Sequence, residues 1–177
     1  MTLAAHLQAI EAALNDADLP PCCDVAISPG RFDASELGRT SFRGPALRVA
    51  FLGAPRTTPL ADTSRRYGCA FAVFILTEGR NRAIEGLDLT ELVAEVVELN
   101  RFSHARVGIP DSIRLDTLYS GDVDDKGVSI FSVSWTQAMR IGASVGSGTA
   151  SLDAAVPDSE RELTEHFELI QEPGLDD

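Results

Sequence analysis

The chain has 177 residues, 44% of them hydrophobic, and a formal net charge of −12. This length and composition favour one domain with one hydrophobic core, and no stretch approaches the roughly 20 apolar residues that cross a bilayer. The acidity argues against an outer surface built to bind nucleic acid, because duplex binding depends on many Lys and Arg contacts to phosphate.

The N-terminal segment MTLAAHLQAIEAAL is predicted to form an amphipathic helix, from residue 2 to about residue 18, and not a signal peptide. It lacks a basic region and contains Glu11. Pro20 and Pro21 then stop a helix. Because the segment does not read as a signal peptide, we expect synthesis and residence in a cytoplasm. The apolar stripe expected to face the core is Leu3, Leu7, Ile10 and Leu14.

The three cysteines are a poor disulfide framework, because their number is odd and Cys22 and Cys23 are adjacent. Zinc sites need ligands paired at short spacing. His6, His104 and His166 lie far from one another and from the cysteines in the sequence. We expect no metal, and buried or semi-buried thiols.

Strand patterns begin with a short run at 25–27. Residues 30–45 lack periodicity, and a segment of this length is long for a loop in a compact domain. Alternation at 47–51 indicates a strand, and the turn-rich GAPRTTPLADTS follows it. We expect 30–45 and 54–65 to be loops that become ordered on assembly.

The run RRYGCAFAVFILTEG is apolar on both faces, which predicts a central strand covered by helices on at least one side. The next segment, DLTELVAEVVELNRF, predicts a helix capped by Asp88 and seated on the bulky face of that strand. Glu91, Glu95 and Glu98 form its solvent-exposed face. Its expected apolar stripe is Leu89, Leu92, Val93, Val96 and Leu99.

A β-hairpin is predicted from 112–119 and 128–141, joined by SGDVDDKG. The aspartates of the connection, Asp122, Asp124 and Asp125, only superficially resemble a calcium loop. The second strand is longer than usual, and its far end could project past its own sheet and join another subunit. Its core side is predicted to hold Phe131, Val133, Trp135, Met139 and Ile141.

These elements predict an α+β fold: a mostly antiparallel sheet with two main helices packed on it, a long C-terminal β-hairpin and a flexible acidic C-terminal arm. The predicted domain spans residues 1–142, and 143–177 form a Gly/Ser linker and the acidic arm. Within that arm Leu163, Phe167 and Ile170 could form a short helix on docking, or the segment could add a strand. A solvated tail and an arm that docks on a neighbour's arginines both stay open.

Charge is unevenly distributed along the chain. Residues 31–82 hold nine arginines and four acids, a net charge of +5, whereas 1–30 carry −4, 83–141 carry −5 and 142–177 carry −8. The arginines either pair with acidic parts of the same chain, or meet an acidic partner surface or line a channel.

No sequence pattern indicates catalysis or a cofactor. G-x-x-x-x-G-K and G-x-S-x-G are absent, and the glycine cluster 142–148 lies in the linker. The histidines have no Ser or Cys positioned by sequence as a nucleophile. An enzyme whose residues converge only in the fold stays open, and would need a pocket near Asp116 or His104.

The order of elements resembles the Mu-like phage and prophage tail-terminator family over roughly residues 1–142. The resemblance rests on the strands ALRVAFLG, RRYGCAFAVFILTEG and VSIFSVSWTQAMRIG, the helix DLTELVAEVVELN, and the stretches 119–121 and 134–137. It implies an α+β structural subunit without enzymatic activity, in a ring, typically of six, at the head–tail junction of the virion. Such a ring ends tail-tube polymerisation, meets the tail tube protein and the head-side connector protein, and lets phage DNA pass without sequence-specific contact. The acidic segment beyond Gly142 is not fixed by the family pattern.

A ring subunit needs complementary patches on two different faces. We therefore expect five arginines at the subunit interface, the tube contact or the lumen, and reversing two of them, Arg65 and Arg66, should weaken ring formation or tail attachment. Another neck or tail completion protein, an assembly chaperone and a small cytoplasmic enzyme are the alternatives. The five candidates are Arg39, Arg43, Arg56, Arg65 and Arg66.

Overall fold

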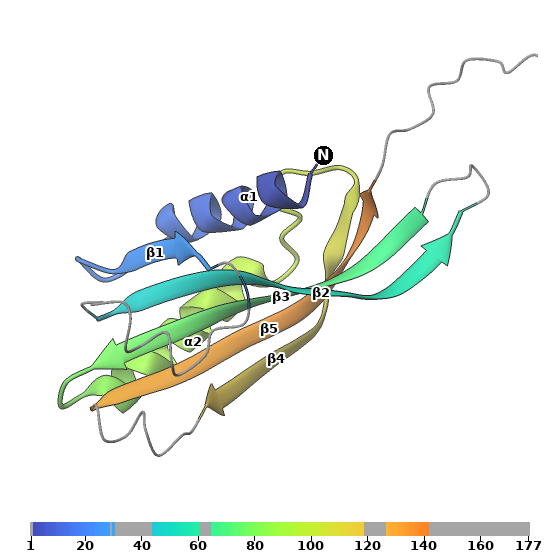
Figure 1. Cartoon of the computed structure of the whole chain (residues 1–177). Coiled ribbons are helices and arrows are strands. Elements are labelled where there is room, and N and C mark those ends of the chain that lie inside the picture. Colours follow the sequence, from blue (N-terminus) through green and yellow to red (C-terminus); the bar gives the residue numbers. More distant parts are fainter. Residues whose placement is uncertain (1, 29, 31–43, 61–64, 119–126, 142–177) are drawn as a thin grey trace, which may run out of the picture. The chain divides into compact units, whose positions relative to one another are not determined.

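The computed structural model describes residues 2–28, 30, 44–60, 65–118 and 127–141. They form two helices and one five-stranded sheet of order β1-β2-β3-β5-β4 (Figure 1). Every neighbouring pair is antiparallel except β1 and β2, which are parallel. The predicted α+β class with a mostly antiparallel sheet is confirmed. The predicted acidic arm, 143–177, and the aspartates of the hairpin connection lie outside the described residues.

Helix α1 (Leu3–Asn15) begins at the Thr2 cap, whose hydroxyl oxygen accepts a hydrogen bond from the Ala5 amide (3.2 Å). Ile10 and Leu14 are fully buried, and Leu3 and Leu7 pack against the same core. The predicted stripe is therefore confirmed. Strand β1 (Asp24–Ile27) follows, as predicted, and pairs with the start of β2.

Strand β2 (Ala46–Pro59) is much longer than the sequence pattern suggested. The expected loop at 54–65 is wrong for residues 54–59, because they continue to pair with β3 (Arg65–Glu78) as far as Pro59 opposite Arg65. Two register shifts interrupt the ladder on either side of Gly53, whose φ is +119°. The glycine of this turn-like sequence suits the irregular ladder, since glycine adopts a positive φ without steric strain. Residues 31–43 of the other expected loop lie outside the described part.

Helix α2 (Arg82–Val97) begins six residues earlier than predicted, with Asn81 and not Asp88 at its N-cap position. Gly86 sits in its second turn because a Cβ there would lie 2.1 Å from the buried ring of Phe131 on β5. Leu89 and Val93 are buried as expected, but Leu99 is 70% exposed. The helix ends at Val97, and Leu99 has a φ of +57°, which turns its side chain out of the stripe.

The C-terminal hairpin is formed by β4 (Val107–Leu118) and β5 (Val128–Ile141). Strand β4 starts five residues before its predicted beginning and, as an edge strand, accommodates Pro110 and two register shifts. The far end of β5 does not extend past its own sheet, because β3 pairs with it along its whole length, up to Arg65 opposite Ile141. The predicted core side of β5 is confirmed.

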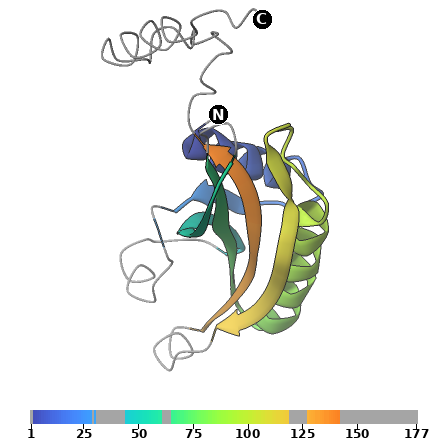
Figure 2. The ribbon, with the colours of Figure 1, turned by 90° about the vertical axis from the view of Figure 1, so that its right-hand side faces the viewer.

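Both helices cover one face of the sheet (Figure 2). The core lies under them and contains the alternate residues of β3 from Cys69 to Ile75. β3 is the middle strand, as predicted. The opposite face carries a smaller apolar cluster, and no helix among the described residues covers it. That cluster is Ala46, Ala50, Ala72, Phe74 and Leu76.

Candidate assembly surfaces

Three of the five candidate arginines lie together at one end of the sheet. Residues 54–59 of β2 and 65–66 of β3, here called the β2–β3 arm, are exposed throughout. The ladder places Arg56 opposite Gly68, and Arg66 opposite Thr58. Arg65 and Arg66 also border the end of β5. Among the described residues, none of these three arginines forms an ion pair, and Arg39 and Arg43 lie outside that part of the chain.

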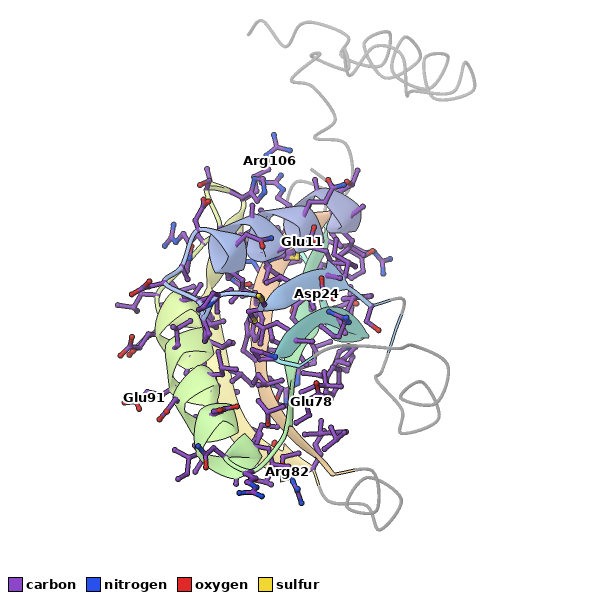
Figure 3. The ribbon with its side chains drawn as sticks, turned by 90° about the vertical axis from the view of Figure 1, so that its left-hand side faces the viewer. Glu11, Asp24, Glu78, Arg82, Glu91 and Arg106 are labelled. Carbon is purple, nitrogen blue, oxygen red and sulfur yellow. The ribbon has the colours of Figure 1, made fainter. Side chains whose placement is uncertain are left out.

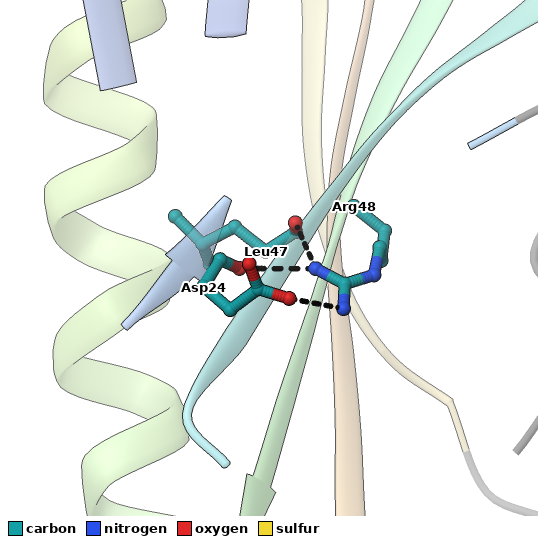
Figure 4. A network of polar contacts seen from close by, with 3 residues as sticks. All are labelled: Asp24, Leu47 and Arg48. Carbon is teal, nitrogen blue, oxygen red and sulfur yellow. Dashed lines mark hydrogen bonds and ion pairs between the residues drawn. The ribbon is translucent and has the colours of Figure 1, made fainter. Parts of the chain in front are cut away.

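Arg48 behaves differently from the arginines of the arm. Its guanidinium donates to the Asp24 carboxylate (2.6 Å) and to the main-chain oxygens of Asp24 and Leu47 (3.0 Å each), as Figure 4 shows. The Arg48 side chain is only 13% exposed. This arginine therefore links β1 to β2. Of the two roles expected for the arginines, Arg48 has the first, because it pairs with an acid of the same chain.

A groove of about 520 Å³ runs between α2 and the edge strand β4. Its apolar lining comes from the exposed Leu87 and Leu115, from Ala94 and from the buried Phe131. Its polar lining is dominated by carboxylates and, among the described residues, contains no basic side chain. The acidic residues of the lining are Asp88, Glu91, Glu95, Glu98 and Asp116.

Three carboxylates of α2 and that of its C-cap residue form one stripe. At 100° per residue, positions 88, 91, 95 and 98 fall within about 80° of the helix circumference. All four side chains are exposed, and Glu91 projects from the helix into solvent (Figure 3). We name these four residues, Asp88, Glu91, Glu95 and Glu98, the α2 acidic stripe.

The stripe does not help α2 to form. Like charges three or four residues apart destabilise a helix by roughly 0.2–0.5 kcal/mol per pair. Carboxylates near the C-terminal end also oppose the helix dipole, and the last turn of α2 has no basic residue. The position of Glu95 and Glu98 is therefore unfavourable for the isolated subunit, and is of the kind that a basic partner would relieve.

The basic arm and the acidic groove lie far apart on the same sheet. Leu115 of the groove pairs with Val133, whereas Arg66 of the arm pairs with Arg140, seven positions further along β5. At about 3.4 Å per residue this separation is roughly 24 Å. A subunit thus cannot place its own arm in its own groove.

A buried polar network joins α1, β5 and the loop after α2. The Gln137 amide oxygen accepts from Trp135 Nε1 (3.0 Å) and lies 3.1 Å from His6 Nε2, while its amide nitrogen donates to the carbonyls of Asn100 and Gly108 (3.0 Å each). Because that oxygen can only accept, Nε2 of His6 carries the proton. Burial is the largest cause of a lowered His6 pKa.

The two histidines that seemed distant in sequence are neighbours in the fold. The ring centroids of His6 and His104 are 5.9 Å apart, although the two residues are distant in the sequence. His6 Nδ1 and His104 Nε2 are buried and have no hydrogen-bond partner among the described residues. Among those residues no group of three or more potential metal ligands occurs, and no helix is long and apolar enough to cross a membrane.

The thiols are also distributed differently from expectation. Cys69 is buried and Cys23 is partly buried, as expected, but Cys22 is exposed. Cys22 sits in the turn before β1 with a φ of +73°, beyond the reach of the core.

Compared with models of known protein families and with curated protein sequences, the chain gives no match.

The groove was not predicted from sequence. The signal that could have found it is the spacing of the acids in 88–98, which by itself predicts only the solvated side of a helix.

Proposed function

We propose that this chain is a structural subunit of a phage tail terminator. Copies assemble into a closed ring, expected to be hexameric, that caps the tail tube at the head–tail junction and stops its polymerisation. The ring's partners are the tail tube protein on one side and the head-side connector protein on the other, with DNA passing through the lumen without sequence-specific contact. The subunit is made in the host cytoplasm and has no catalytic role.

The observation that best supports self-assembly is the separation of opposite charges on one rigid sheet. The β2–β3 arm presents Arg56, Arg65 and Arg66 without ion-pair partners among the described residues, and Leu115 of the acidic groove lies roughly 24 Å from Arg66 along β5. Two different complementary patches on one subunit are what a head-to-tail contact requires, and such contacts generate rings when the rotation closes. The choice of a tail terminator among ring proteins depends on the resemblance in element order.

Light scattering of the purified full-length chain over a range of concentrations tests the assembly. A closed oligomer, present alone or at high concentration, supports the proposal, and its loss in Arg65→Glu/Arg66→Glu supports the role of the arm. A strict monomer that is missing from mature particles would instead favour an assembly chaperone.

Electron micrographs of tails made with and without the protein test the terminator role itself. Overlong tail tubes in its absence are expected, because nothing then stops the polymerisation of the tube. Tubes of normal length that fail to join heads would contradict the terminator role and favour another neck completion protein.

A further inference from the structure

The α2–β4 groove has features that the proposed function leaves unexplained. Its floor includes two leucines that are more than half exposed, Leu87 at 57% and Leu115 at 54%. Its rim is the α2 acidic stripe, which disfavours the helix that carries it. A concave apolar surface bordered by charges of one sign fits a partner that is apolar in part and basic.

The β2–β3 arm of a second copy matches this description. It offers Arg56, Arg65 and Arg66, together with the exposed threonines and prolines of 54–59. Arginine suits such a contact, because its planar guanidinium pairs with carboxylates in bidentate fashion and its stem packs on apolar surface. The two strands of the arm are hydrogen-bonded to each other, with the bulges at Gly53 at its base. The backbone that carries the arginines is therefore held in place by the sheet.

We infer that the β2–β3 arm of one subunit docks in the α2–β4 groove of the next, so that arm arginines pair with the α2 acidic stripe. The inference depends on the proposed self-assembly and names the contact that produces it. The two surfaces differ and cannot meet within one subunit, so each subunit gives its arm to one neighbour and receives the arm of another. This arrangement is head-to-tail and leaves no unpaired surface once the ring closes.

Charge reversal on the full-length chain tests the contact. Glu91→Lys/Glu95→Lys, the groove variant, should weaken association at least about tenfold, as should the arm variant Arg65→Glu/Arg66→Glu. At concentrations where both chains are monomeric, the groove variant should melt no lower than the unmodified chain, since lysines in the second half of α2 relieve repulsion and suit the helix dipole. A loss of assembly then cannot be attributed to misfolding.

Two further variants control for the change in net charge. Asp16→Lys/Asp18→Lys alters exposed acids after α1, outside the groove, and Glu162→Lys/Glu165→Lys alters the C-terminal acidic segment. Each changes the charge by the same amount as the groove variant, and both should assemble normally. If the C-terminal variant lost assembly while the groove variant kept it, the arm would bind the acidic tail, and the inference would be wrong.

Mixing gives the most specific outcome. The groove variant and the arm variant should each remain monomeric alone, yet a 1:1 mixture should assemble, because every contact in an alternating ring again joins opposite charges. A mixture that stays monomeric, or a groove variant that assembles like the unmodified chain, overturns the inference while leaving self-assembly intact. An unmodified chain that is monomeric at every concentration overturns the proposed function as well.

Discussion

Gln137 and His6 are 131 positions apart in the chain, and their side chains meet inside the fold at 3.1 Å. Both residues are at most 1% exposed. Through this contact α1 is tied to β5, and through the two carbonyls that Gln137 holds, β5 is tied to the loop after α2 and to the start of β4. One buried amide therefore joins four segments: α1, β5, the loop after α2 and the start of β4.

Replacing Gln137 by Leu should lower the free energy of unfolding by at least about 3 kcal/mol. The substitution leaves buried polar groups of His6 and Trp135 and part-buried carbonyls of Asn100 and Gly108 without their partner, and each buried group costs roughly 1–3 kcal/mol. Urea denaturation followed by tryptophan fluorescence measures the change. Thr136→Val, which removes one exposed hydrogen bond to Asp111, is the matched control and should cost less than about 1 kcal/mol. Equal losses in both variants would contradict the importance of the network.

Stability should decline as the pH falls below about 6.5 because of His6. Its pKa in the folded state is lowered from 6.5, first by burial and also by the neighbouring His104. The unfolded chain therefore takes up a proton at a higher pH than the folded chain, so the free energy of unfolding rises with pH across this interval. The contribution is fully present above the unfolded pKa and is lost as the pH falls toward the folded one.

Denaturation curves at several values between pH 5.5 and 7.5 measure that slope. His6→Gln should flatten it, whereas His104→Gln should retain most of it, because burial is the first cause of the shift. An unchanged slope in His6→Gln would show that other groups produce the dependence. The rings that surround His6 are Phe71, Phe102 and His104.

Gly86→Ala should destabilise the domain by about 1–3 kcal/mol, the usual range for overpacking a core, even though alanine is the better helix former by up to about 1 kcal/mol. The added Cβ would lie 2.1 Å from Phe131 Cε2, and that ring is held in the core. Thermal unfolding measures the loss. The double variant Gly86→Ala/Phe131→Leu should be less unstable than the sum of its single variants. Strict additivity would mean that the two positions do not compete for space.

The sequence pattern predicted the elements whose local signals agree with their environment. The α1 stripe, the central strand and the core side of β5 repeat with clear periods, and they were found where expected. The start of α2 was missed because Gly86 weakens the helix signal while serving the packing of Phe131. The extension of β2 was missed because bulges at Gly53 and the prolines look like a turn until the pairing with β3 is known.

The candidate surfaces were predictable only in part. The clustering of arginines in 31–82 is a property of the sequence, but which of them are engaged depends on the fold, as the Arg48–Asp24 pair shows. The groove needs Leu115 of β4 beside Leu87 of α2, a long-range proximity without a local signature. His6 and His104 became neighbours for the same reason.

The three cysteines should differ sharply in their reactivity toward a thiol reagent. Burial raises the pKa of the Cys69 thiol to about 11 and also raises the pKa of Cys23, and the thiolate is the reactive form. Cys22 is exposed and should react first, with Cys69 labelled only when the domain unfolds. Mass spectrometry after timed labelling at pH 8, with and without denaturant, assigns the sites. Because Cys69 is fully buried and belongs to the core to which both helices contribute, its rate of labelling reports opening of the core, and Gly86→Ala should accelerate it while Cys22→Ser should not. Rapid labelling of Cys69 in the folded chain would mean that this part of the core opens readily.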